Sequence, residues 1–161
     1  MKKSIFTLLF ALLAVAGMAQ IPSTNLKNLE GKTVDTSKLS NDGKPMVIAF
    51  FASWCKPCNR ELTAISEVYE EWQQETGVKL FAVSIDQGQN AQKVKPFVDA
   101  KGWPFDILLD PNSDFKRALG IGNIPHSLVI DGEGKIVYSH SGYAEGAEND
   151  LYEEVKKACG K

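Results

Sequence analysis

Cys55 and Cys58 stand two residues apart, where a buried strand would pass into a helix. An apolar run covers 46–52 before them, and apolar residues recur at helical spacing over 62–72 after them. The pair would therefore lie on the first turn of a helix, with both sulfur atoms on one face and close enough to bond. Pro57 fits this turn, because the amides of a first helical turn have no partner within the helix. We interpret the pair as a redox-active dithiol.

Thiol–disulfide exchange needs a thiolate that attacks and a second thiol that resolves the mixed disulfide. A helix N-terminus favours the thiolate, because its unpaired amides carry a partial positive charge. Cys55 is nearest the end of the strand and is predicted to be the exposed nucleophile, whereas Cys58 is predicted to be the deeper, resolving thiol. Lys56 and Pro57 lie between the two and are predicted to tune them, Lys56 as a nearby cation.

Three other uses of a cysteine pair compete with this interpretation. A structural disulfide that closes so small a loop would restrain the unfolded chain only slightly. A zinc site would need a second cysteine pair or paired histidines, and Cys159, His126 and His140 supply neither at ligand spacing, so we expect no metal. Two thiolates do suit Cu(I). The alternative function is therefore a copper-carrying or partner-docking binding module.

Strands and helices alternate along the rest of the chain, which predicts an α/β fold: a central mixed sheet with helices on both faces and an added N-terminal β-hairpin. The hairpin is predicted over 26–39 and a second hairpin over 127–140. The other predicted strands cover 46–52, 78–85 and 105–109. Helices are expected from Cys58 to about Thr76, over 90–100, up to Leu119 and over 145–159, with Pro96 kinking the second or delaying its start.

The first residues have the pattern of a signal peptide. A basic start precedes an apolar run over 5–16, and small residues at 17–19 suit cleavage after position 19. The apolar run is shorter than the roughly 20 residues that span a bilayer, and an uncleaved anchor is the alternative. We therefore expect 1–19 to be removed and 20–161 to form one exported domain, soluble in the periplasm or elsewhere outside the cytoplasm.

The charge balance argues against two classes of partner. Without Lys2 and Lys3, 16 of the 18 basic residues remain against 20 acidic ones, so the formal net charge falls from −2 to −4. Such a balance disfavours nucleic acid and anionic membranes as partners. We expect a monomer that binds no nucleic acid.

Residues 50–58, Phe-Phe-Ala-Ser-Trp-Cys-Lys-Pro-Cys, resemble the active site of the thioredoxin superfamily. Together with 122–125, Gly-Asn-Ile-Pro, and the apolar strand after it, the chain resembles the exported TlpA/ResA-like branch of thiol–disulfide oxidoreductases linked to cytochrome c maturation. The resemblance implies a thioredoxin-like fold and a protein-disulfide oxidoreductase whose redox group is the Cys55–Cys58 disulfide, with no other cofactor. The implied partners are exported proteins with disulfides and a membrane-bound thiol electron donor.

The resemblance also assigns roles to further residues. Pro125 is implied to be cis and to face the dithiol, and Ile124 to offer backbone hydrogen bonds to an extended substrate. Trp54 is expected to cover the dithiol and contact the substrate. Glu61 matches an acidic residue of this branch, and its helical offset from Cys58 would let it exchange a proton with the resolving thiol. The alternative for Glu61 is a glutamate that only stabilises the helix dipole.

Several positions depart from the family pattern. Ala49 replaces the buried acid of thioredoxin itself, and Thr63 stands near a position where many relatives have a helix-kinking proline. His126 replaces a common threonine and is expected to tune the sulfurs or simply to be hydrogen-bonded. A thiol peroxidase is a weaker alternative, because Ala52 stands where its threonine would be. Cys159 is expected to be a buried, inert thiol, with an intermolecular disulfide as the alternative.

Overall fold

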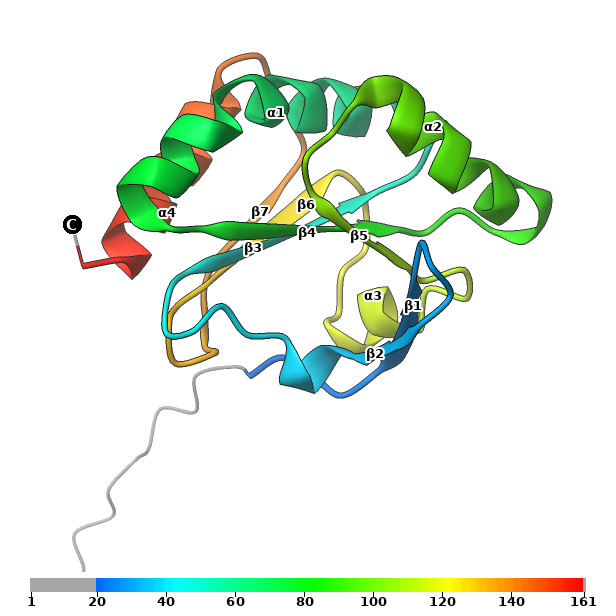
Figure 1. Cartoon of the computed structure of the whole chain (residues 1–161), viewed down its shortest axis with the longest axis horizontal. Coiled ribbons are helices and arrows are strands. Elements are labelled where there is room, and N and C mark those ends of the chain that lie inside the picture. The colour runs from blue at the N-terminus through cyan, green and yellow to red at the C-terminus, as the bar shows by residue number, and fades with distance from the viewer. Residues whose placement is uncertain (1–19, 161) are drawn as a thin grey trace, which may run out of the picture.

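The computed structural model describes residues 20–160, so the predicted signal peptide lies outside the described residues. One seven-stranded sheet with the order β2-β1-β5-β4-β3-β6-β7 forms its centre (Figure 1). The strands are β1 (Asn25–Asn28), β2 (Thr33–Asp35), β3 (Met46–Phe51), β4 (Lys79–Ser84), β5 (Asp106–Leu109), β6 (His126–Ile130) and β7 (Ile136–Ser141). The helices are α1 (Lys56–Thr76), α2 (Val94–Lys101), α3 (Asp114–Ala118) and α4 (Ala147–Ala158). Across residues 20–160, no helix combines the length and apolarity needed to span a bilayer.

The centre of the sheet is parallel and its flanks are antiparallel, as expected for a mixed sheet. β4 pairs in parallel with both β3 and β5, whereas β6 pairs antiparallel with β3 and β7 with β6. The crossovers through α1 and α2 therefore return to the same face of the sheet, as right-handed connections do. All six residues of β3 are buried, because both faces of this strand are covered.

Two hydrophobic cores lie on the two faces of the sheet. Figure 1 shows α1, α2 and α4 on one side and α3 with the β1–β2 hairpin on the other, which confirms helices on both faces. Alternate residues of β3 point into the two cores. Val47, Ala49 and Phe51 face the helices in what we call the helical core. Met46 and Phe50 face the lower core, which includes Leu26, Phe115 and Ile121.

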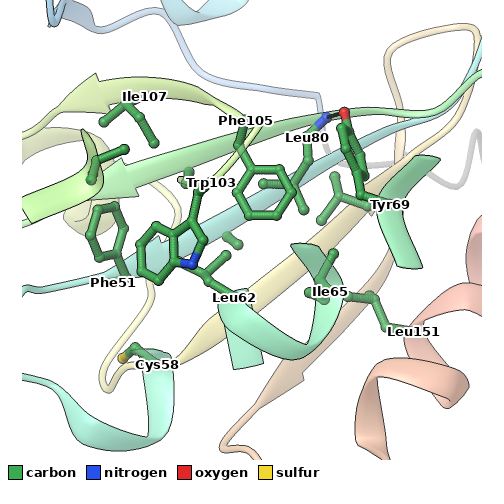
Figure 2. Close-up of a cluster of buried hydrophobic side chains, with 14 of the residues drawn as sticks. Phe51, Cys58, Leu62, Ile65, Tyr69, Leu80, Trp103, Phe105, Ile107 and Leu151 are labelled. Atoms are coloured by element: carbon green, nitrogen blue, oxygen red, sulfur yellow. Dashed lines mark hydrogen bonds between the residues drawn. The ribbon is translucent and has the colours of Figure 1, made fainter. Parts of the chain in front are cut away.

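The helical core holds the start of α1 against the sheet. Figure 2 shows Cys58, Leu62 and Ile65 on one face of α1, next to Phe51 and Trp103. Cys58 and Ile65 have no exposed surface, and Leu62 has 1%. Because the apolar residues recur at helical spacing, one face of the helix is buried and also carries a sulfur atom into the core.

α1 ends where it was predicted to end. α2 starts later than the predicted segment 90–100, which is the second of the two effects expected of Pro96. Gly77 has a left-handed backbone, φ 67°, and its N–H donates to the Gln73 carbonyl, which closes α1. A 3₁₀ segment covers Gly88–Lys93, and α2 begins only at Val94. Pro96 is then the third residue of α2, where its missing N–H leaves no hydrogen bond broken.

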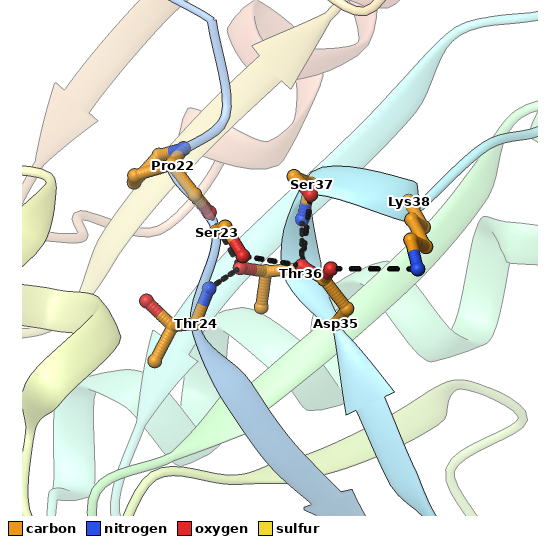
Figure 3. A network of polar contacts seen from close by, with 7 residues as sticks. All are labelled: Pro22, Ser23, Thr24, Asp35, Thr36, Ser37 and Lys38. Atoms are coloured by element: carbon orange, nitrogen blue, oxygen red, sulfur yellow. Dashed lines mark hydrogen bonds and ion pairs between the residues drawn. The ribbon is translucent and has the colours of Figure 1, made fainter.

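The N-terminal hairpin is shorter than predicted. β2 ends at Asp35 and a 3₁₀ turn, Thr36–Lys38, follows. Figure 3 shows the reason, a network that ties this turn to the segment before β1. The buried Thr36 hydroxyl donates to the Pro22 carbonyl (2.6 Å) and accepts from the Thr24 N–H (2.9 Å), and the Asp35 carboxylate accepts from Ser37. These side-chain bonds replace the strand ladder.

The C-terminal helix differs from the prediction at both ends. α4 begins at Ala147 and ends at Ala158. Cys159 follows it as a free, half-buried thiol whose sulfur lies 3.6 Å from the Thr76 carbonyl oxygen. The expectation of a buried Cys159 is therefore wrong, because the residue lies past the last apolar turn, at the C-cap of the helix. At the other end of the described chain, Gln20 forms an antiparallel bridge with Lys135.

Candidate active site

The first turn of α1 holds the two cysteines together. Cys55 is the N-cap residue, and its sulfur accepts a hydrogen bond from the Cys58 N–H at 3.3 Å. Pro57 lies in the first turn, as predicted. Cys55 and Cys58 form a disulfide, with their Cα atoms 5.3 Å apart. The structure therefore brings together the two sulfurs of the predicted dithiol at the start of a helix.

Cys55 is more exposed to solvent than Cys58, as predicted, although both residues are buried. Cys55 is 6% exposed and Cys58 has no exposed surface. In the disulfide form, therefore, the expectation of an exposed Cys55 is wrong, because this residue packs in the helical core beside Cys58. Trp54 is 62% exposed, and Lys56 is also exposed. An approaching partner would thus meet Trp54 and Lys56 before it met the sulfurs.

A buried carboxylate anchors the loop between β3 and the cysteines. Asp86 is 1% exposed and accepts hydrogen bonds from the Ser53 N–H (2.8 Å), the Ser53 hydroxyl (2.6 Å) and the Ser84 hydroxyl (2.8 Å). The Asn59 side chain also donates to the Ser53 carbonyl at 3.0 Å. Sequence reasoning missed this anchor. Its signal was an acidic residue two positions after a buried parallel strand, next to the strand that leads to the dithiol.

Glu61 lies on the cysteine face of α1, one turn from Cys58. Its side chain is nearly buried, 5% exposed, and Oε1 accepts a hydrogen bond from the Ser127 hydroxyl at 2.8 Å. Burial raises the pKa of Glu61 from 4.5 to about 7; the bond from Ser127 opposes this rise, and the negative charge of Glu148 adds to it. A carboxyl group with such a pKa exchanges protons readily near neutral pH.

The loop before β6 brings Pro125 to the same edge of the sheet as the dithiol. The Ile124–Pro125 peptide bond is cis, as the resemblance implies. β6 pairs with β3 in the register Phe50 to His126, so Pro125 lies one step further, opposite Phe51. Phe51 leads directly into the cysteine loop. Pro125 is buried, its carbonyl accepts from the Gly142 N–H at 2.9 Å, and Ile124 is half-buried.

His126 is placed on the other face of the sheet. Neighbouring strand residues point to opposite faces, so the His126 side chain lies on the lower-core side and Ser127 on the side of Glu61. The His126 ring forms a hydrogen bond with the Ser139 hydroxyl at 2.9 Å. Burial, followed by the charges of His140 and Lys116, lowers the pKa of His126. The structure thus matches its hydrogen-bonded alternative, and tuning of the sulfurs stays a prediction.

A comparison with protein families places the chain. The sequence model of the AhpC/TSA family matches residues 18–139. The chain belongs to the AhpC/TSA family. Within this family it is a TlpA/ResA-like member of the thioredoxin superfamily, because both its sequence relatives and its structural neighbours are thioredoxin-like proteins of this kind.

Two relatives of this AhpC/TSA chain carry the name thiol-disulfide oxidoreductase ResA. The protein from Bacillus thuringiensis (strain Al Hakam) is 33% identical over 118 residues, which cover 73% of this chain and 65% of the relative. The protein from Bacillus thuringiensis subsp. konkukian is 30% identical over 138 residues, which cover 86% of this chain and 76% of the relative. The chain thus spans about two thirds to three quarters of their length.

Solved structures give the same fold for this AhpC/TSA chain. The solution structure of a thioredoxin-like protein from Porphyromonas gingivalis is 60% identical, with a TM-score of 0.78 over 88% of this chain and 93% of that one. The crystal structure of StoA from Bacillus subtilis is 26% identical, with a TM-score of 0.63 over 83% of this chain and 97% of that one. The predicted thioredoxin-like fold is confirmed.

Proposed function

We propose that the protein is a protein-disulfide oxidoreductase that reduces disulfides in other exported proteins outside the cytoplasm, in the manner of cytochrome c maturation factors. The observation that carries the proposal is the Cys55–Cys58 disulfide at the start of α1, with buried Glu61 one turn away. The ResA relatives support the activity.

The reaction uses the two sulfurs in turn. The Cys55 thiolate of the reduced protein attacks a substrate disulfide, so a mixed disulfide forms and one substrate sulfur leaves as a thiolate. Cys58 loses its proton and attacks the Cys55 sulfur, which forms the intramolecular disulfide and releases the second substrate sulfur. Two electrons and two protons pass from the protein to the substrate. Glu61 takes up the proton of Cys58 in the second step.

The residues around the sulfurs would receive the substrate. The exposed Trp54 and the Ile124–Pro125 loop form the contact surface, with backbone bonds at Ile124 to an extended segment. Lys56 and Pro57 tune the thiols from within the first turn of α1. No metal or added cofactor takes part, because the reduced pair of Cys55 and Cys58 itself carries the two electrons.

We infer the location and the partners from the predicted signal peptide at 1–19. The exported protein, a monomer once 1–19 is removed, would need a thiol donor at the membrane to return it to the dithiol form. A retained anchor at 1–19 would serve the same chemistry. The substrates are exported proteins with accessible disulfides, including apocytochrome c, and nucleic acid is not a partner.

The first experiment removes the nucleophile. Cys55→Ser should abolish dithiothreitol-coupled reduction of insulin disulfides, because serine cannot form the mixed disulfide. Cys159→Ser is the matched control and should keep wild-type turnover, since this thiol lies at the far end of the last helix. Full activity of Cys55→Ser would overturn the proposal.

A second experiment decides the direction of electron flow. Equilibration of the Cys55–Cys58 pair in redox buffers of known composition gives its reduction potential, and about 30 mV changes the equilibrium constant tenfold. A potential near that of thioredoxin, about −270 mV, supports a reductase. A potential near −120 mV, as in strong oxidants, would reverse the assignment.

A further inference from the structure

The Ser127 hydroxyl donates a hydrogen bond to Glu61, and the family resemblance gives Ser127 no role. Ser127 is 1% exposed, and its hydroxyl donates to Glu61 Oε1 at 2.8 Å. In the described part of the chain, Ser127 is the only residue that donates a hydrogen bond to the Glu61 carboxyl group. Ser127 is also a strand residue, paired with Ala49 of β3, so the backbone of the sheet fixes its position.

The other elements around Glu61 offer few polar groups. On this face β3 presents Val47 and Ala49, which are apolar. β7 places His140 opposite Ser127, but that side chain is exposed. Cys58, on α1 itself, is bonded to Cys55 in this form. On α4, the negative charge of Glu148 raises the pKa of Glu61.

Glu148 is held in place by its own partners. Its Oε2 atom accepts from the Tyr143 hydroxyl at 2.8 Å and from the Gly146 N–H at 3.1 Å. Both donors belong to the loop between β7 and α4, so the carboxylate sits at a fixed point in the first turn of α4. A negative charge near a second carboxyl group disfavours its ionisation, whereas a hydroxyl donor favours it. Ser127 and Glu148 therefore act on Glu61 in opposite directions.

We propose that Ser127 is a positioning residue for the redox reaction, which orients the Glu61 carboxyl group toward proton exchange with Cys58 and stabilises its ionised form against the charge of Glu148. This inference rests on the proposed function, because it concerns the second step of that reaction. In the mixed disulfide, the Glu61 carboxylate takes the proton of the Cys58 thiol. The new thiolate attacks the Cys55 sulfur, the bond between Cys55 and the substrate breaks, and the substrate sulfur leaves as a thiolate that water protonates.

Only ionised Glu61 can accept that proton, so the resolving step should accelerate as pH rises through the pKa of Glu61. Ser127→Ala removes the donor and should move this profile to higher pH by about one unit, since a hydrogen bond to a charged group is lost. Glu148→Gln removes the like charge and should move it to lower pH. Ser127→Thr keeps a hydroxyl group and should restore a profile near that of the wild type.

The experiment follows the Glu61 carboxyl directly. The protein is labelled with ¹³C at its glutamate carboxyl carbons, and the titration of Glu61 is recorded by NMR in the disulfide form of the wild type and the three variants, with Glu61→Gln to assign the signal. The protein is then converted to a mixed disulfide with a simple monothiol, and the rate at which the monothiol is released is measured as a function of pH. Opposite shifts for Ser127→Ala and Glu148→Gln, in both measurements, are the expected result.

Two outcomes would overturn the inference. The Glu61 titration and the release profile of Ser127→Ala could superimpose on those of the wild type, or Ser127→Thr could behave like Ser127→Ala. Glu148→Gln changes a half-buried surface side chain. If Ser127→Ala unfolds, the titration of Glu61 can therefore still be compared between Glu148→Gln and the wild type. The NMR titration needs no turnover, and failure of the proposed function would instead appear as unchanged activity in Cys55→Ser.

Discussion

Glu61 carries an ionisable group into the helical core, and this burial has a cost that depends on pH. The pKa of Glu61 is raised in the folded protein from 4.5 to about 7, with burial as the largest cause. The folded state therefore binds this proton more tightly than the unfolded chain does. Stability from this group is fully present below pH 4.5 and is lost as pH rises toward 7.

The variant Glu61→Gln tests this cost. Between about pH 4.5 and pH 7, the wild type should lose on the order of 3 kcal/mol of unfolding free energy through Glu61, because each pKa unit corresponds to about 1.4 kcal/mol. Glutamine cannot ionise but can still accept from Ser127, so the variant should lack this loss and be the more stable protein at pH 8. Guanidinium unfolding of the disulfide form at pH 5, 6.5 and 8 measures the difference. Parallel pH profiles would contradict it.

The order of the two cysteines gives a second prediction at this scale. Cys58→Ser should accumulate a mixed disulfide with its substrate, because Cys55 can still attack but nothing resolves the product. Cys55→Ser should not, since the remaining thiol, Cys58, lies deeper in the core. Mass spectrometry after incubation with an oxidised peptide compares the two. Equal trapping by both variants would show that the attacking and resolving roles are wrongly assigned.

Individual residues were predictable when their signal was local. Cys55 and Cys58 follow from their spacing, and Glu61 follows from its helical offset from Cys58 together with the family pattern. Ser127 and Asp86 were not predicted, because their roles depend on which strands are neighbours. Ser127 reaches Glu61 only because β6 lies beside β3, and Asp86 reaches Ser53 only because β4 lies on the other side of β3.

The loop between β3 and α1 is an element whose shape depends on one carboxylate. Asp86→Ala removes the acceptor of three hydrogen bonds, two of them from Ser53, and leaves buried donors without partners. We expect a loss of about 2–4 kcal/mol of unfolding free energy, because each unsatisfied buried group costs about 1–3 kcal/mol.

The matched control for the loop is Asp99→Ala. Asp99 forms an exposed ion pair with Lys95, so its removal should change stability by less than about 1 kcal/mol. Chemical unfolding of both variants makes the comparison. Equal effects of the two substitutions would mean that Asp86 does not anchor the loop.

At the scale of elements, the periodic segments were the predictable ones. The buried strand β3, the helix α1 and its end at Gly77 follow from apolar spacing and a glycine. Elements governed by side-chain bonds were predicted less well: β2 stops at Asp35 because Thr36 donates to the Pro22 carbonyl and Asp35 accepts from the Ser23 hydroxyl, both in the segment before β1. These bonds join residues about twelve or more positions apart, which no short sequence window contains.

For the whole molecule, the lower core depends on the N-terminal hairpin. Leu26 of β1 is 3% exposed and packs with Phe115 and Ile121, so the hairpin is part of the fold rather than an appendage. Leu26→Ala should reduce the unfolding free energy by about 2–5 kcal/mol, the usual range for a cavity in a core. The reduction potential should stay the same, because Leu26 lies on the face of the sheet opposite the sulfurs.

Val137→Ala is the control for the lower core. Val137 is 41% exposed on the edge strand β7, and its truncation should change stability by about 0.5 kcal/mol or less. Calorimetry and redox titration of both variants separate the two effects. A large shift in potential for Leu26→Ala would mean that the two cores are coupled through the sheet.

The bridge between Gln20 and Lys135 fixes the start of the described chain at the end of the molecule opposite the two sulfurs. Lys135 lies in the turn between β6 and β7, beside the first residue of β3, whereas Cys55 follows the last. The length of β3 separates them, about 20 Å for six residues. Anything attached through Gln20, whether a lipid bilayer or a bead in an assay, would hold the protein by one pole and leave the opposite pole, with its sulfurs, turned outward to passing proteins.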